Sequence, residues 1–198
     1  MNSDYPFSFF DPGTDIDMKQ HRLPHWQQDD VWVFVTWRLA DSLPKSKLDK
    51  WTEEKSIWLV LHPEPWDEKT ENEYHERFSC QIDAWLDEDS GSCLLKKHEN
   101  AKIVSDALCY FDGQRYQLAS FVVMPNHVHV LFRPFKEYSI AEIVKSWKGF
   151  TAREINKQSG KKGSLWEEDY WDRLIRSEQH FFKVMEYIRE NPKGGRVH

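Results

Sequence analysis

The chain has 198 residues, 39% of them hydrophobic and 15% aromatic, which is enough for one domain with a sizeable core. No stretch approaches about 20 consecutive apolar residues, and the first residues lack a basic start with an apolar run, so we expect a cytoplasmic protein without a membrane span or secretory signal. The formal net charge of −6, taken alone, argues against a nucleic-acid partner, and the three cysteines show no metal-ligand spacing.

The first half of the chain predicts one strand followed by helices. Residues 1–30 read as irregular, whereas "VWVFVTWRL" (31–39) is apolar on both alternating faces, which is typical of a central strand covered on both sides. Ser46 is the candidate cap of the first helix, and residues 51–100 are acidic, with 13 acidic and five basic side chains. The predicted helices of this half lie within 41–62, at 72–87 and at 93–110.

In the second half, predicted strands and helices alternate. Ser139 and Ser177 are candidate caps of two helices, and Gly160 is the candidate end of the first of them. The predicted elements are strands at 117–124 and 127–134, a helix at 139–160, a short strand within 161–175 and a helix at 177–191. This order favours an α+β fold with a ferredoxin-like antiparallel sheet and helices packed on one of its faces.

A basic run lies on the helix at 139–160 and in the loop after it. Against one acidic residue, Glu154, this run carries six basic ones, which indicates a polyanion partner. An ordinary solvated helix face would carry a similar pattern, so both interpretations stay open. The six residues are Lys145, Lys148, Arg153, Lys157, Lys161 and Lys162.

Two histidines, His127 and His129, alternate with valines on the strand 127–134. Residues i and i+2 of a strand point to the same face, so the two imidazoles project side by side while Val128 and Val130 point the other way. A neighbouring pair of neutral imidazoles is half of a site for a divalent cation. The alternative is a pair of strand histidines that only form hydrogen bonds.

The final helix places a polar stripe beside an apolar one. His180, Val184, Tyr187 and Asn191 recur at helical spacing, while Phe181, Met185 and Ile188 form the adjacent stripe expected to dock on the sheet. Asn191 offers an amide oxygen to a hard cation, and Tyr187 offers a phenol that could attack a phosphorus atom. A tyrosine at the rim of the core, with its hydroxyl in water, is the alternative for Tyr187.

Several segments resemble a known family. "MPNHVHVLF" (124–132) resembles the His-hydrophobic-His motif of the HUH single-tyrosine transposases, and "EYIRENP" (186–192) resembles their tyrosine helix. The similarity extends over residues 20–192 and points to the subgroup of REP-associated tyrosine transposases. It implies the HUH endonuclease fold as a single domain, 1–198, with a helical acidic insertion at about 45–110. The segments that resemble the subgroup are "RLPHW", "FVTWRLADSLP", "KGFTAREIN" and "LWEEDYWDRLIRSEQHF".

The resemblance also implies roles for individual residues. His127, His129 and Asn191 would bind Mg²⁺ or Mn²⁺, and Tyr187 would be the nucleophile that attacks a phosphodiester of single-stranded DNA beside a hairpin. The products would be a 5′-phosphotyrosine and a 3′ hydroxyl, and the strand could be rejoined without ATP. The expected partner is single-stranded or hairpin DNA, bound by a monomer or homodimer. A competing nucleophile is Tyr170, which follows three acidic residues that would repel a phosphate.

The candidates for contact with DNA are basic residues. Three aromatic residues, Trp147, Phe150 and Trp166, are either core residues or platforms on which bases stack. In the subgroup the N-terminal segment helps to recognise a sequence beside a hairpin, which makes Arg22 and His25 candidates here. The candidates elsewhere in the chain are Lys148, Arg153, Lys161, Lys162, Arg173 and Arg176.

Two other functions compete with a transposase. "HVHVLF" also resembles the start of the histidine-triad nucleotide hydrolases, but Leu131 stands where their third alternating histidine would be, so the nucleophile is missing. The second alternative is a domesticated relative that binds hairpin DNA without cleaving it. A cleavage assay on hairpin DNA with Mg²⁺ separates this alternative from an active enzyme.

Overall fold

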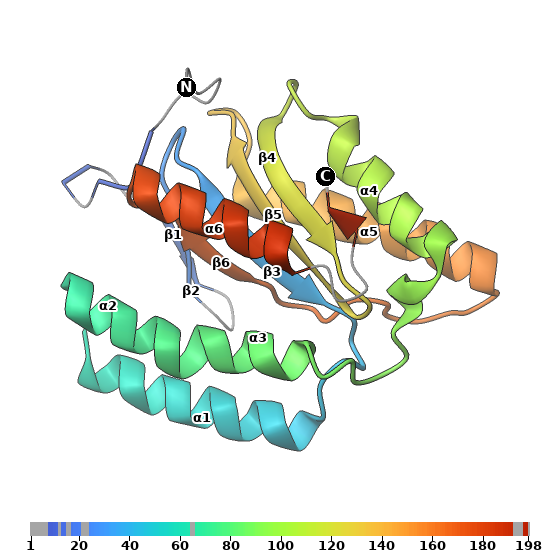
Figure 1. Cartoon of the computed structure of the whole chain (residues 1–198), viewed down its shortest axis with the longest axis horizontal. Coiled ribbons are helices and arrows are strands. Elements are labelled where there is room, and N and C mark those ends of the chain that lie inside the picture. Colours follow the sequence, from blue (N-terminus) through green and yellow to red (C-terminus); the bar gives the residue numbers. More distant parts are fainter. Residues whose placement is uncertain are drawn as a thin grey trace.

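The computed structural model describes residues 8–11, 13–14, 17–20, 24–63, 66–191 and 196–197. Its centre is an antiparallel sheet with the strand order β6-β3-β5-β4-β7 (Figure 1). The predicted strands at 31–39, 117–124 and 127–134 are confirmed and lie in this one sheet. The strands are β3 (Val33–Arg38), β4 (Tyr116–Val123), β5 (His127–Pro134), β6 (Trp171–Leu174) and β7 (Arg196–Val197).

Helices cover both faces of the sheet. The helices α4 (His98–Tyr110) and α5 (Ile140–Ser159) pack on one face, and α6 (Glu178–Glu190) crosses the other (Figure 1). The predicted ferredoxin-like α+β fold is confirmed, but the prediction that helices occupy one face is wrong. The reason is that both faces of the central strands are apolar, so the apolar stripe of α6 has a surface of its own to cover.

The side chains of β5 divide between the two faces. Val128 and Val130 belong to the core beneath α4 and α5 and so point away from the histidines, as predicted, and Leu131 belongs to the core beneath α6. Phe181 and Ile188 of α6 are fully buried in this second core. His127 and His129 alternate with the valines and therefore share the α6 face.

The acidic segment folds as helices beside the edge strand β6 (Figure 1). They form a small core of their own, which contains Trp51, Trp58 and Phe78 and against which Trp171 of β6 packs. Ser46 is not a cap, because the first helix begins after Pro44 without a side-chain cap bond. The elements are α1 (Lys45–Leu61), α2 (Glu68–Tyr74), the π-helical turn η1 (His75–Ser79) and α3 (Cys80–Leu86), and a 3-10 turn, η2 (Leu94–Lys96), leads into α4.

Helix caps and the N-terminal segment complete the fold. Ser139 forms a capping box with Glu142, Gly160 ends α5 with φ of 64°, and Ser177 accepts a hydrogen bond from the His180 amide, as the sequence predicted. Within residues 1–30, expected to be irregular, β1 (Asp17–Gln20) and β2 (Pro24–Gln27) form an antiparallel pair. Among the described helices, none is long and apolar enough to cross a membrane. The single domain with an insertion at 45–110 stays a prediction.

Candidate active site

The two histidines of β5 face each other beneath α6. Both side chains are completely buried, and their Nε2 atoms are 2.9 Å apart. The Nδ1 atom of each ring has a partner on the opposite side: Asn126 Oδ1 lies 2.7 Å from His127, and Thr36 Oγ1 lies 2.7 Å from His129. The fold therefore turns both Nε2 atoms toward one point.

Asn126 fixes the tautomer of His127. Its Nδ2 donates to the carbonyl oxygens of Leu86 and Ser90, both at 3.1 Å, so its Oδ1 must be the atom that faces the histidine. An amide oxygen can only accept, so His127 carries its proton on Nδ1 and leaves a lone pair on Nε2. The Thr36 hydroxyl can donate or accept, so it supports either tautomer of His129.

Burial keeps both imidazoles neutral. It lowers the pKa of His127 to about 3, and burial together with the neighbouring His127 lowers the pKa of His129 well below its ordinary value. A neutral imidazole is the form that binds a metal. The pair is therefore in the metal-binding protonation state throughout the physiological pH range.

The geometry fits a hard divalent cation with octahedral coordination. Ligand bonds of about 2.1 Å at right angles separate neighbouring ligand atoms by about 3.0 Å, and the two Nε2 atoms are 2.9 Å apart. In the described part of the chain no group of three or more His, Cys, Asp and Glu side chains comes together, so a third protein ligand would be of another type. Two histidines alone also do not make a structural zinc site, which takes four protein ligands.

Asn191 lies at the C-terminal end of α6, one turn after Tyr187. Its side chain is buried, and within the described residues its Nδ2 has no hydrogen-bond partner and no hydrogen bond joins it to either histidine. An amide that the fold leaves unfixed can turn its oxygen toward a cation. In the predicted ligand set the amide oxygen suits Mg²⁺ or Mn²⁺, whereas the two imidazoles also suit metals such as Zn²⁺ and Fe²⁺, so the choice of Mg²⁺ or Mn²⁺ stays a prediction.

Tyr187 lies directly against the histidine pair. Its hydroxyl is 3.4 Å from His129 Nε2, and its ring meets the His129 ring edge-on at a centroid distance of 5.3 Å. Phe34 of β3 stacks on the other side of His129, with centroids 5.4 Å apart. Burial and the nearby Asp83 and Asp87 raise the pKa of Tyr187 above its ordinary value, so the phenol needs a proton acceptor before it can attack.

The competing nucleophile Tyr170 lies elsewhere. Its ring is buried in the core beneath α4 and α5, on the face of the sheet opposite the histidines. Burial and the neighbouring Asp172 and Asp169 raise its pKa. Of the two tyrosines weighed from the sequence, Tyr187 is the one that the fold brings to the imidazole pair.

A cleft of about 720 Å³ leads to Tyr187, and we call it the α1–α6 cleft. One wall is α6, the opposite wall is made by α1, η1 and α3, and the floor is made by β3 and β6. Its polar and aromatic lining residues include Phe34, Thr36, Lys55, Asp83, Arg173 and Tyr187. The acidic helical segment therefore forms one side of the candidate active site.

Residues 94–191 match the family model described as "Transposase IS200 like". This segment of the chain belongs to the IS200-like transposase family. The matched segment contains the histidine pair, Tyr187 and Asn191, whereas β3 and α1–α3 precede it. No curated protein matches the chain significantly.

Two solved structures of transposases are similar to the chain at low identity. The REP-associated tyrosine transposase bound to a REP hairpin is 14% identical, with a TM-score of 0.39 over 96% of this chain and 72% of that one. A candidate transposase from Deinococcus radiodurans R1 is 16% identical, with a TM-score of 0.32 over 81% of this chain and 89% of that one. The family assignment rests on the match over residues 94–191.

The predicted DNA contacts of this transposase are split between two sides of the sheet. Arg173 and Arg176 line the α1–α6 cleft, as does Lys183, which the sequence did not single out. Arg153, Lys161 and Lys162 are exposed on α5 and in the loop after it, on the face away from the histidines. Their contact with DNA stays a prediction, and the structure does not bring them to the candidate active site.

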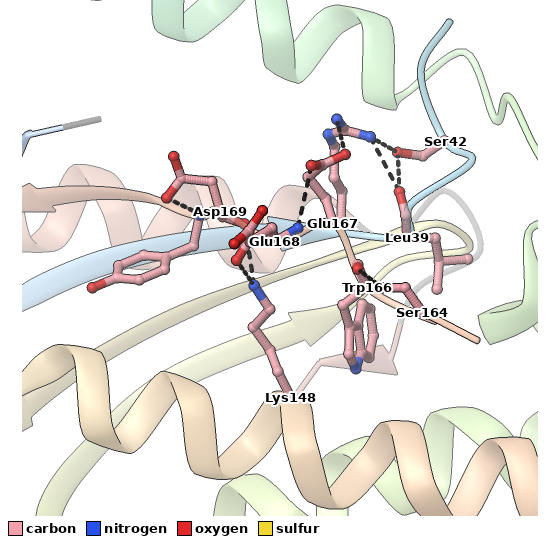
Figure 2. Close-up of polar contacts among 10 residues, drawn as sticks. Leu39, Ser42, Lys148, Ser164, Trp166, Glu167, Glu168 and Asp169 are labelled. Carbon is pink, nitrogen blue, oxygen red and sulfur yellow. Dashed lines mark hydrogen bonds and ion pairs between the residues drawn. The ribbon is translucent and has the colours of Figure 1, made fainter. Parts of the chain in front are cut away.

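Lys148 differs from the other cations of the basic run. Its Nζ donates to the carbonyl oxygens of Glu168, at 2.7 Å, and Asp169, at 3.2 Å (Figure 2). Burial lowers its pKa to about 8, against the nearby acidic residues that raise it. This amine is already engaged in holding the segment before β6, so a contact with DNA would have to replace those bonds.

The segment before β6 is also tied to the end of β3. The guanidinium of Arg38, a buried residue paired with His127 across the sheet, donates to Glu167 Oε2 at 2.9 Å and to the Leu39 carbonyl and Ser42 hydroxyl at 3.2 Å (Figure 2). Burial lowers the Arg38 pKa, although Glu167 opposes the shift. These bonds hold in place the strand that carries Thr36.

The remaining predicted contacts have mixed outcomes. Arg22 lies outside the described residues, and His25 lies in β2 but its side chain is not described. Trp147 and Trp166 are buried core residues, whereas Phe150 is exposed. The core interpretation is therefore right for the two tryptophans.

Proposed function

We propose that this transposase is a metal-dependent endonuclease that cleaves and rejoins single-stranded DNA beside hairpin sequences through a 5′-phosphotyrosine. The observation that carries this proposal is the 3.4 Å approach of the Tyr187 hydroxyl to His129 Nε2, within a buried pair of neutral imidazoles. The match to the IS200-like family supports a transposase, and the resemblance of residues 22–26 and 165–181 to the REP-associated subgroup supports the hairpin partner.

His127, His129 and Asn191 would hold Mg²⁺ or Mn²⁺. When bound, this ion would polarise the scissile phosphate and neutralise charge that develops in the transition state. Asn126 and Thr36 would keep the imidazoles aimed at it by accepting their Nδ1 protons.

Tyr187 would attack the phosphorus atom. A bond forms between its hydroxyl oxygen and phosphorus, the bond from phosphorus to the 3′ oxygen breaks, and the released 3′ oxygen takes up a proton. Because the energy of the phosphodiester is kept in the covalent linkage, the 3′ hydroxyl of a second strand can reverse the step. Phe34 and His129 confine the Tyr187 ring, which fixes the direction from which the oxygen approaches.

Asp83 of α3 is the group that would take the Tyr187 proton. It lines the same cleft as Tyr187 and acts on its titration, and burial raises the pKa of Asp83 to about 7, partly offset by Arg173. A base whose pKa lies near the working pH transfers protons most effectively in both directions. The acidic helical segment would thus supply the proton acceptor as well as one side of the cleft.

Cleavage of a labelled hairpin with a single-stranded flank tests this function. Wild-type protein with Mg²⁺ should release a fragment with a free 3′ hydroxyl and stay linked to the 5′ phosphate of the other fragment, and EDTA should abolish the reaction. His127→Ala combined with His129→Ala should remove cleavage while circular dichroism stays native. Cleavage by the double variant at the wild-type rate would refute the metal site, whereas DNA binding without cleavage by wild-type protein would identify the non-cleaving alternative.

A further inference from the structure

A buried lysine without a partner lines the α1–α6 cleft. Lys55 of α1 is 5% exposed, and its Nζ lies 5.0 Å from the centroid of the Trp51 ring and 5.3 Å from that of Tyr74. Within the described part of the chain no hydrogen bond or ion pair reaches this amine. Asp172 and Asp169 act on it only through longer-range attraction.

The other lysines of α1 show the contrast. Lys47 is exposed and lies 3.3 Å from Glu88, and the exposed Lys50 lies 3.9 Å from Glu54. Lys55 instead follows Trp51 by one turn, on the face that packs inward. An ion pair at the surface usually adds little folding stability. A buried cation without a charged partner destabilises the fold, and contacts with aromatic ring faces offset only part of this cost.

The amine nevertheless stays charged near neutral pH. Burial lowers its pKa to about 8, and the two aspartates oppose that shift. A positive charge held at the wall of a cleft, without an anion of its own, is a site prepared for an anionic ligand. Arg173 from β6 and Lys183 from α6 line the same cleft, so cations lie on its floor and on both walls.

We propose that Lys55 binds a backbone phosphate of the single strand that lies in the α1–α6 cleft and leads to Tyr187. The identity of the strand rests on the proposed function, whereas the anion site rests on the position of Lys55. The cleft is too small to enclose a double helix, and its aromatic lining, which includes Phe34 and Trp171, suits unpaired bases. Because α1 precedes the segment that matches the family, this contact belongs to the acidic helical segment.

The test compares Lys55→Met with Lys50→Met. Binding of a fluorescent single-stranded oligonucleotide is measured by anisotropy in EDTA, without cleavage, over a series of salt concentrations. Lys55→Met should bind about fivefold more weakly at low salt, and the slope of log affinity against log salt should become shallower by about 0.7, which corresponds to one phosphate contact. Lys50→Met and Lys55→Arg should retain the wild-type slope.

Three outcomes would overturn the inference. The first is an oligonucleotide affinity and salt slope in Lys55→Met equal to those of wild type, and the second is a loss of affinity in Lys50→Met as large as that in Lys55→Met. The third is a Lys55→Met variant that loses affinity for inorganic phosphate but not for the oligonucleotide, which would mean that the site takes a free anion. Thermal unfolding shows whether Lys55→Met is folded, and methionine suits the apolar surroundings of Trp51 and Tyr74. If Lys55→Met weakens strand binding but wild-type protein forms no covalent adduct, the proposed function alone is refuted. If wild-type protein forms the adduct and Lys55→Met binds the strand as wild type does, this inference alone is refuted.

Discussion

Replacing Thr36 with valine should weaken metal binding without unfolding the protein. Valine has nearly the same shape as threonine, and the lost contact is the bond of 2.7 Å between Thr36 Oγ1 and His129 Nδ1. Without that hydroxyl, His129 is best satisfied by carrying its proton on Nε2 and donating it to the lone pair of His127 Nε2, 2.9 Å away. This tautomer points a proton at the place where a cation would bind.

The size of the effect follows from the contacts. The fold loses one buried hydrogen bond and leaves His129 Nδ1 without a partner, which costs about 1 to 3 kcal/mol. The metal loses an orienting group, and such losses lower affinity about 10- to 100-fold. The expected change in binding free energy is therefore about 1.4 to 2.7 kcal/mol.

Titration with Mn²⁺, with free Mn²⁺ measured by electron paramagnetic resonance, gives the affinity directly. Thr151→Val is a matched control, because Thr151 is as deeply buried and donates to the Trp147 carbonyl at 2.7 Å, but lies on α5 on the opposite face of the sheet. The control should lose stability and keep the wild-type affinity. Equal affinities in Thr36→Val and wild type would refute the claim that Thr36 orients His129 toward a cation.

Three further changes have defined outcomes. Asp83→Asn should slow covalent adduct formation at least about tenfold. The wild-type rate should fall as pH drops through about 7, the pKa to which burial raises this carboxyl, and the variant should lack this fall. The variant should also lack the wild-type loss of folding stability as pH rises toward 7, because the native Asp83 carboxyl holds its proton more tightly than the unfolded chain does. Glu167→Ala should lower the free energy of unfolding in urea by about 2 kcal/mol, since it leaves the buried Arg38 without its carboxylate; an unchanged midpoint would contradict the role of this pair. Lys161→Glu combined with Lys162→Glu should weaken binding to hairpins of different sequence equally, because phosphate contacts carry no base information; unchanged binding would mark the run as a solvated face.

The local part of the site could be predicted from the sequence. The period of two in a strand placed His127 and His129 on one face, and helical spacing placed Tyr187 and Asn191 one turn apart on α6. The caps Ser139 and Ser177 could be recognised because capping depends on residues three or four positions away. These features depend on short stretches of chain, where pattern and structure are closely linked.

The rest depends on contacts between distant segments. Thr36 meets His129 across 93 positions, and no local pattern distinguishes this threonine from others in the chain. The face of the sheet that each helix covers is decided by packing, so the basic run on α5 could not be placed away from the histidines beforehand. Lys55 could have been recognised from the sequence, because in an otherwise acidic segment it shares an inward helical face with Trp51 and Trp58.

The covalent linkage is the most direct test of the central claim. Wild-type protein, Tyr187→Phe and Tyr170→Phe are each incubated with hairpin DNA and Mg²⁺, digested and examined by mass spectrometry for a nucleotide remnant. The position of Tyr187 beside His129, and of Tyr170 on the opposite face of the sheet, predicts a remnant on Tyr187 in wild type and in Tyr170→Phe, and none in Tyr187→Phe. A remnant on Tyr170, or an adduct that survives in a folded, DNA-binding Tyr187→Phe variant, would contradict it.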